Sequence, residues 1–471
     1  MLALASGGGL MTTLRVSVSS NEDEGDRRSL DPAISGDGRF VAFRSDATDL
    51  VFGDTNDLTD IFVRDLELGI TTRVSTSSSG AQADGECFMA SISADGRVVA
   101  FSSQASNLVA NDNNHVEDVF VVERLTHRLL RISTDSAGVE GDGRSYEPRL
   151  SLDREQVVFT STATNLVADD QNDRADVFVK DLKTDRTMRV SVGTNGEQGN
   201  GASTSGSVSR DGRFVAFASV ASNLVADDHN GCCDVFLHDC VTGETRRLSV
   251  DGNGNEGNHA STQPVITPDG SCVAFQSFAQ NLVGSDTNDT YDIFVKDVSS
   301  GTVTRVSIDS QGNESNGKSG LPAISDDGRY VVFASDATNL VAFDTNESRD
   351  IYVHDRLAHM TTRVSVAALG EQANDGSNEP AISGSGAAVA FLSVATNLVK
   401  HDGNGYTDVF VRTAITPGTT TPAGSSQQPL DGLTGGMVGT SWRGRLARIV
   451  AVPIRFWMRQ AHGPAGHRES P

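Results

Sequence analysis

Residues 54–63 read Asp-Thr-Asn-Asp-Leu-Thr-Asp-Ile-Phe-Val, and the same frame returns six more times along the chain. The seven copies, each 58 residues after the last, begin at Asp54, Asp112, Asp170, Asp228, Asp286, Asp344 and Asp402. In every copy the frame Asp-x-Asn-x-x-x-Asp is intact and a short apolar run follows it. Repeats at a fixed period of this length are typical of solenoids and propellers, in which each unit buries its apolar surface against its neighbours.

Each unit is predicted to form four short strands separated by turns. In the first unit we expect strands at residues 32–35, 39–45, 60–65 and 71–76. Second strands such as Phe214-Val215-Ala216-Phe217 are apolar at successive positions, so both of their faces must be covered. No helical period of 3.6 residues is sustained, and four-stranded units repeated radially form a β-propeller. The predicted fold is therefore an all-β, seven-bladed propeller built from 58-residue repeats.

A second repeated element, the triplet Arg-Val-Ser, predicts how the ring closes. It begins at Arg15 and recurs with the same period as far as Arg363, with Ile or Leu at its centre in two copies. The last copy precedes the final Asp-x-Asn loop, and none follows it. We therefore expect the N-terminal strand, residues 14–18, to complete the last blade, whose other strands lie between Pro380 and Arg412.

Two stretches of each unit resemble a known repeat. In the first unit they are Ile34-Ser35-x-Asp37-Gly38-Arg39 with Val41-Ala42-Phe43, and Asp60-Ile61-Phe62-Val63-x-Asp65. They resemble the WD-like propeller repeat of TolB-type proteins, and the resemblance covers about residues 12–413. It implies a binding propeller, often exported and sometimes attached to a peptidase domain.

Composition divides the chain into four parts, which we expect to be an N-terminal lead (1–11), the propeller (12–414), a Thr/Pro/Ser-rich linker (415–432) and a disordered basic tail (433–471). The lead has no basic region, so no signal peptide is predicted despite the exported character that the resemblance implies. The apolar run at 449–454 is too short to cross a bilayer, so no transmembrane segment is predicted.

The charge of the chain restricts its partners. The net charge is −24, and the part from Ile415 onward holds six Arg against two acids, so the repeat body is more acidic than the whole. Nucleic acid is not expected as a partner, because a phosphate-binding surface needs clustered Lys and Arg. An acidic body favours solubility and attracts cations and basic partners. We expect a monomer.

The topology of a four-stranded blade sorts the loops between two faces. The connections between strands one and two and between strands three and four are tight turns, and they define the plain face. The connections between strands two and three and from strand four to the next blade are long and acidic, and they define the loop face. Loops on a rigid scaffold usually carry function, so recognition is expected on the loop face.

The Asp-x-Asn-x-x-x-Asp frame resembles the start of a calcium loop, where oxygen ligands surround a hard cation. The alternative is a structural turn, in which the Asn is followed by a residue in a turn conformation and the last Asp anchors strand three to a neighbouring loop. The serine column Ser29, Ser145, Ser203, Ser261, Ser319 and Ser377 is a candidate partner for that Asp. The candidate Ca²⁺ ligands are Asp54, Asn56, Asp60, Asp112, Asn114, Asp118, Asp170, Asn172, Asp176, Asp228, Asn230, Asp234, Asp286, Asn288, Asp292, Asp344, Asn346, Asp350, Asp402, Asn404 and Asp408.

A catalytic site on a near-symmetric ring would lie where the symmetry is broken. The residue just before strand one varies from blade to blade, and Asp31, Glu147 and Glu379 are its acidic members. Asp31 and Glu379 fall on adjacent blades, and paired carboxylates can perform acid–base chemistry on a glycoside. No Gly-x-Ser-x-Gly elbow is present.

The predicted function is a non-catalytic binding propeller that presents its acidic loop face to a protein, peptide or glycan. One alternative is a glycan or lactone hydrolase or lyase that uses Asp31, Glu147 and Glu379. Another is a calcium-stabilised surface protein.

Overall fold

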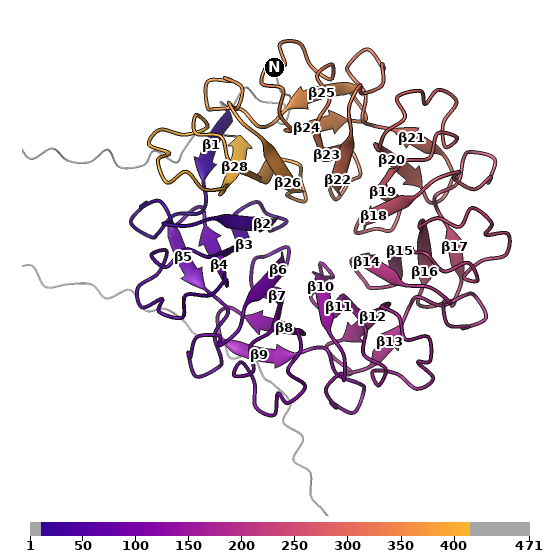
Figure 1. The fold of residues 1–471 in the computed structure, drawn as a ribbon, viewed down its shortest axis with the longest axis horizontal. Helices are drawn as coiled ribbons and strands as arrows, with labels where there is room; N and C mark the ends of the chain where they lie inside the picture. The colour runs from indigo at the N-terminus through magenta and orange to yellow at the C-terminus, as the bar shows by residue number, and fades with distance from the viewer. Residues whose placement is uncertain (1–10, 415–471) are drawn as a thin grey trace, which may run out of the picture. The chain divides into compact units, whose positions relative to one another are not determined.

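The computed structural model describes residues 11–414, which form seven four-stranded antiparallel sheets arranged around a central axis (Figure 1). All regular elements in this range are β-strands, so no helix among these residues could span a membrane. The predicted linker (415–432), the basic tail (433–471) and residues 1–10 of the lead lie outside the described residues.

The strands follow one another in chain order within each blade, from the axis outward. Blade 1 contains β2 (Ser29–Ile34), β3 (Phe40–Ser45), β4 (Asp60–Asp65) and β5 (Ile70–Arg73), blade 2 contains β6 (Cys87–Ile92), β7 (Val98–Ser103), β8 (Asp118–Glu123) and β9 (Arg128–Arg131), and blade 3 contains β10 (Ser145–Leu150), β11 (Gln156–Ser161), β12 (Asp176–Asp181) and β13 (Thr187–Arg189). Blade 4 contains β14 (Ser203–Val208), β15 (Phe214–Ser219), β16 (Asp234–Asp239) and β17 (Thr245–Arg247), and blade 5 contains β18 (Ser261–Ile266), β19 (Cys272–Ser277), β20 (Asp292–Asp297) and β21 (Val303–Arg305). Blade 6 contains β22 (Ser319–Ile324), β23 (Tyr330–Ser335), β24 (Asp350–Asp355) and β25 (Met360–Arg363), and blade 7 contains β26 (Ser377–Ile382), β27 (Ala388–Ser393), β28 (Asp408–Ala414) and the N-terminal strand β1 (Met11–Arg15).

The predicted closure of the ring is confirmed, although the closing strand runs from Met11 to Arg15 and not over residues 14–18. The N-terminal strand β1 pairs antiparallel with β28, with Met11 opposite Ala414 and Arg15 opposite Phe410. The last blade therefore combines one strand from the start of the propeller with three from its end, and Figure 1 shows β1 beside β28.

The core lies between the blades. Each of seven apolar clusters joins residues of two adjacent blades, as where Ile61 and Val63 of β4 pack with Val99 and Phe101 of β7. Within blade 1, Phe43 of β3 stacks on Phe62 of β4 with ring centroids 5.8 Å apart, and every other blade has an equivalent aromatic pair. Apolar residues on both faces of the inner strands are thereby removed from water, the main source of stability for such a ring.

The outermost strand differs from its expected position. Strand β5 ends at Arg73, so the Val and Ser of the triplet lie beyond it instead of extending the strand to Thr76. The physical reason is that the Ser75 hydroxyl bonds to the Asp60 carboxylate and accepts the N–H of Ile61 at 3.0 Å. This contact turns the chain away from the sheet edge.

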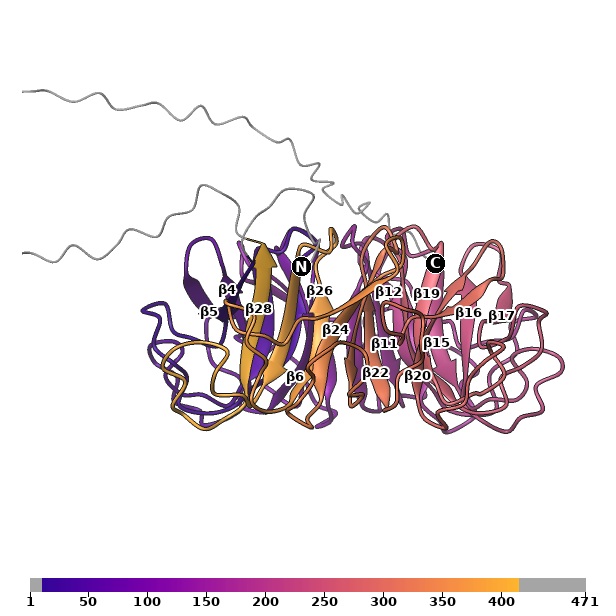
Figure 2. The same ribbon diagram turned by 90° about the horizontal axis from the view of Figure 1, so that it is seen from above.

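The connections form two unlike faces, as expected. The loops 46–59 and 74–86 of the first repeat lie on the loop face, while the tight turns after β2 and β4 lie on the plain face (Figure 2).

Candidate functional site

The Asp-x-Asn loops form closed hydrogen-bonded turns. In the first loop, Asn56 Oδ1 accepts the N–H of Leu58 at 3.3 Å, and its Nδ2 donates to Asp60 Oδ2 at 3.0 Å and to the carbonyl of Ala83 at 3.1 Å. The residue after the Asn takes a left-handed conformation in all seven loops, with a φ of 57° at Asp57. The turn conformation expected after the Asn is therefore present.

An arginine from the Arg-Val-Ser triplet lies between the two carboxylates of each loop. Arg73 Nη1 is 2.9 Å from Asp54 Oδ1 and 3.2 Å from Asp60 Oδ2. The corresponding cations of the other blades are Arg131, Arg189, Arg247, Arg305, Arg363 and, from the N-terminal strand, Arg15. A guanidinium thus occupies the place between the carboxylates, with its side chain only 6% to 10% exposed.

A third carboxylate joins the arginine in four of the blades. Glu140 lies 2.7 Å from Arg131, and Glu24, Glu256 and Glu314 make the same contact. In two other blades the position holds a glutamine that bonds to the same Asp pair, as Gln198 does with Asp170 and Asp176. Sequence reasoning missed this column of Glu and Gln, although it has the same 58-residue period.

Burial of these carboxylates disfavours their charged form. Desolvation raises the pKa of Asp118, Asp286 and Asp408 to about 6 each, and the nearby arginine opposes the shift.

The loops fit calcium only if the guanidinium moves aside. In the last loop Glu24, Asp402 and Asp408 bring carboxylate oxygens within 4.8 Å of one another, but Arg15 lies 3.1 to 3.6 Å from all three residues. A calcium ion at this place would have to displace the arginine. The calcium sites remain a prediction that carries this structural requirement.

Further hydrogen bonds fasten the two long loops to each other. Asp26 accepts the N–H and hydroxyl of Thr48, and Asn107 of the next repeat donates to the carbonyl of Gln82. The serine column does not contact the loop Asp as expected, because Ser29 bonds to Ser45 on the paired strand and Asp60 bonds to Ser75. Hydrogen bonds therefore tie neighbouring loops of this face together.

The residue expected just before strand one lies inside that strand, because β2 begins at Ser29 and not at residue 32, and it forms a β-bulge at the wall of the central channel. The strand register shifts between Leu30 and Ala33, and every other blade has the same irregularity. The bulged residue has a φ between 44° and 57° in all seven blades, a conformation that costs free energy in residues other than Gly. The seven bulged residues line a cavity of about 420 Å³ and are Asp31, Met89, Glu147, Ser205, Gln263, Leu321 and Glu379.

Asp31 and Glu379, which the sequence placed on adjacent blades, are in contact. The backbone N–H of Asp31 donates to Glu379 Oε2 at 3.0 Å, and the Asp31 carboxylate pairs with Arg44 Nε at 2.5 Å. Glu147 lies elsewhere on the wall, where it accepts the N–H of Ser205 at 3.0 Å. The channel thus holds one carboxylate pair and one separate acid.

The two members of the pair differ electrostatically. Burial, followed by the negative charge of Asp31, raises the pKa of Glu379 to about 7. Asp31 has its own cation in Arg44, a residue that sequence reasoning missed because only blade 1 has an arginine in this column.

Turn-to-turn contacts narrow the plain-face end of the channel. Arg210 N–H donates to the carbonyl of Pro268, and Asp326 N–H to the carbonyl of Gly384, each at 2.8 Å. The side chains of Arg210 and Asp326, from blades 4 and 6, lie 3.7 Å apart. The bulged residues, near the start of the innermost strands, lie toward the loop-face end.

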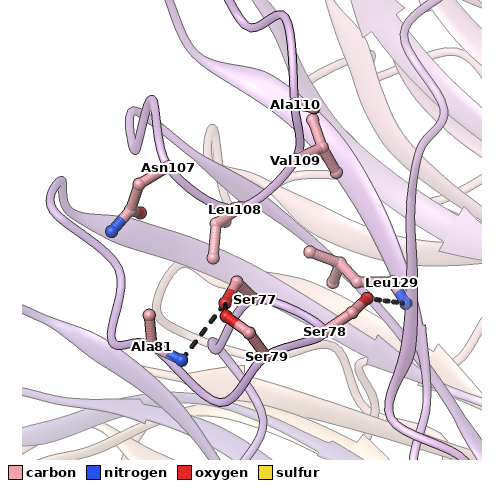
Figure 3. Close-up of a pocket in the computed structure, with 9 residues that line it drawn as sticks. All are labelled: Ser77, Ser78, Ser79, Ala81, Asn107, Leu108, Val109, Ala110 and Leu129. Atoms are coloured by element: carbon pink, nitrogen blue, oxygen red, sulfur yellow. Dashed lines mark hydrogen bonds between the residues drawn. The ribbon is translucent and has the colours of Figure 1, made fainter.

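Blade 2 has a second, shallow hollow on its outer side (Figure 3). Leu108, Val109 and Leu129 form its apolar part, and Ser77, Ser78 and Ser79 face them. In blade 3 the corresponding place is closed by a polar clamp, in which Lys180 donates to the carbonyl of Asp135 at 3.0 Å. The clamp is missing in blade 2 because Val122 stands in the column of Lys180.

Comparisons with known proteins find structural neighbours of the propeller. No family model and no curated protein matches the sequence. An oligogalacturonate lyase in complex with manganese is 13% identical over 86% of this chain and 91% of that one, with a TM-score of 0.50. TolB from Acinetobacter baumannii is 16% identical over 69% and 62%, with a TM-score of 0.40. The β-propeller domain of the Trilobed protease from Pyrococcus furiosus is 12% identical over 78% and 91%, with a TM-score of 0.47. These likenesses concern the fold alone.

Proposed function

We propose that this propeller is a binding module that holds a protein, peptide or glycan ligand at the mouth of its channel on the loop face. The observation that carries the proposal is where the seven repeats differ. The Asp and Asn of the loop frame and the Arg and Ser of the triplet recur in every blade. The bulged residue at the mouth instead changes from blade to blade, as with Asp31, Met89 and Leu321. A recognition site on a ring needs such unlike side chains, because identical blades offer a single asymmetric ligand identical contacts.

The surrounding surface favours cationic or neutral ligands. Several loop acids are exposed, among them Asp84, Asp142, Asp227 and Asp289, and exposed bases are fewer. Complementary charge speeds encounter and orients the partner before the mouth is engaged.

The test is a screen of the full chain against an oligosaccharide array and a displayed library of random peptides. For each hit, affinity is compared between the wild type, the mouth variants Met89→Ala and Gln263→Ala, and the control Arg154→Ala. Arg154 lies on a plain-face turn, where it pairs with Asp95 at 2.9 Å. Loss of affinity in the mouth variants alone supports the proposal. Equal loss in the control, or none in the mouth variants, contradicts it.

The carboxylate pair favours a second candidate, a glycan or lactone hydrolase or lyase. Glu379 with a pKa raised to about 7 is suited to donate a proton near neutral pH, while Asp31 stays paired with Arg44. Turnover of a glycan and lactone panel that disappears in Glu379→Gln would favour this candidate. Turnover that survives in that variant would exclude Glu379 as its acid.

A further inference from the structure

Blade 5 carries a cluster of aromatic rings on the loop face. Phe278 and Tyr291 have ring centroids 5.3 Å apart, and His259 meets Phe278 edge-on at 5.2 Å. Phe278 directly follows β19, Tyr291 directly precedes β20, and His259 lies two residues before β18. All three are therefore at the loop-face ends of the strands, and β18 carries the mouth residue Gln263.

The fold does not require this cluster. In the other six blades the column of Phe278 holds Asp46, Gln104, Thr162, Val220, Asp336 and Val394, and the column of Tyr291 holds Thr59, Glu117, Ala175, Cys233, Arg349 and Thr407. Phe278 and Tyr291 are only partly buried and His259 is exposed, so apolar ring surface is left in water. Exposed rings at a fixed geometry are common at binding sites, because they offer a large contact area with little loss of conformational freedom.

Polar groups at this place are available to a ligand. Neither the Tyr291 hydroxyl nor the His259 ring makes a hydrogen bond within residues 11–414. A ligand hydroxyl can therefore bond to either group without displacing a protein partner. The Lys318 ammonium lies 5.2 Å from the Tyr291 ring centroid, which places a cation over that ring.

We infer that this cluster is a subsite for a neutral pyranose ring, an inference that rests on the proposed binding function. A pyranose has a flat face of C–H groups that can stack on Phe278 or Tyr291 and a rim of hydroxyls that can bond to Tyr291 and His259. The acidity of the surrounding loops disfavours a polyanionic glycan.

The test is calorimetric titration of the full chain with neutral gluco-, manno- and chito-oligosaccharides, and in parallel with aromatic and proline-rich peptides. We expect an oligosaccharide to bind, Phe278→Ala to weaken it roughly tenfold or more, and Tyr291→Phe to weaken it less because the ring is kept. The control is Phe52→Ala, which removes a fully exposed aromatic of the same face from blade 1. Melting curves show whether each variant folds, and Tyr291→Phe keeps the test decisive if Phe278→Ala is damaged.

Binding of no neutral oligosaccharide, or equal binding by the wild type and Phe278→Ala, would overturn the subsite. A peptide bound with dependence on Met89 and Gln263 but not on Phe278 would overturn the subsite and leave the proposed binding function standing. Equal weakening by Phe52→Ala would also overturn it, since the effect would then belong to exposed aromatics in general.

Discussion

Arg73 holds Asp54 at 2.9 Å in a place where the aspartate side chain is 2% exposed and the arginine 10%. The same guanidinium reaches Asp60, whose side chain is wholly buried. One residue of the outer strand thus pairs with two carboxylates of the loop, and the arrangement recurs around the ring. The loop motif is a charge-paired structural unit, whatever else it binds.

Replacing Arg73 with Ala should lower the free energy of unfolding by about 3 kcal/mol, because two buried carboxylates lose their cation. Urea unfolding of the variant and the wild type measures the change. The matched control is Arg28→Ala, since Arg28 pairs with Asp46 at 2.5 Å but its side chain is 57% exposed. The control should cost no more than about 1 kcal/mol. Equal losses would show that burial does not decide the strength of these pairs.

Calcium should raise the melting temperature of Arg73→Ala more than that of the wild type. Removal of the guanidinium frees the space between Asp54 and Asp60, and the remaining oxygens suit a hard cation. A ligand that binds only the folded state stabilises it in proportion to its occupancy. Scanning calorimetry with excess calcium and with chelator compares the two proteins. A shift in the wild type at least as large would mean that calcium displaces the arginine, as the metal prediction for the loops requires.

Glu379→Gln should stabilise the protein at pH 8 and leave its stability unchanged at pH 4. The folded pKa of Glu379 is raised to about 7, against about 4.3 in an unfolded chain. Between these values the folded state binds the proton more tightly, so this group's contribution to stability falls as pH rises through the window. Glutamine keeps an acceptor for the Asp31 N–H and carries no charge.

Urea unfolding at both pH values measures this difference, with Glu347→Gln as the control because Glu347 is exposed. The control should change stability by less than about 0.5 kcal/mol at either pH. A Glu379→Gln effect that is the same at pH 4 and pH 8 would contradict the raised pKa.

The period of 58 residues was enough to predict the blades, the closing strand and the bounds of β4, because each depends on local patterning that repeats. The end of β5 was not predictable in the same way, since it depends on the Ser75 hydroxyl reaching Asp60 across the blade. The ion pair of Arg73 and Asp60 could have been predicted, because the Arg of the triplet and the last Asp of the loop frame carry opposite charges and recur with the same period. The left-handed conformation of the bulged column had no such signal, because the column also holds Met89, Gln263 and Leu321, residue types that rarely adopt a positive φ. The blade 5 aromatics come from three separate columns, and only the folded chain brings them together.

The loop between blades 1 and 2 should open more readily than its equivalents. In blade 3, Thr187 Oγ1 donates to the carbonyl of Thr134 at 2.6 Å, and Lys180 adds its bond to the same loop. In blade 2 the positions of Thr187 and Lys180 are held by Leu129 and Val122, which have no polar group, so the loop at 77–81 lacks both of these hydrogen bonds. Segments with fewer anchoring bonds open at lower free-energy cost. Hydrogen exchange followed by mass spectrometry should therefore show faster exchange at 77–81 than at 135–139.

The double variant Val122→Lys with Leu129→Thr should slow exchange at 77–81, because it restores the cation and the hydroxyl together. Leu129→Thr alone serves as the control, since it supplies a hydroxyl without the cation that bridges to the loop carbonyl. If the double variant exchanges as fast as the wild type, the hollow of blade 2 is set by the serines of the loop, Ser77 to Ser79, and not by the missing clamp. If it exchanges more slowly and the single variant does not, the cation at the position of Lys180 is what fastens this loop to the next blade.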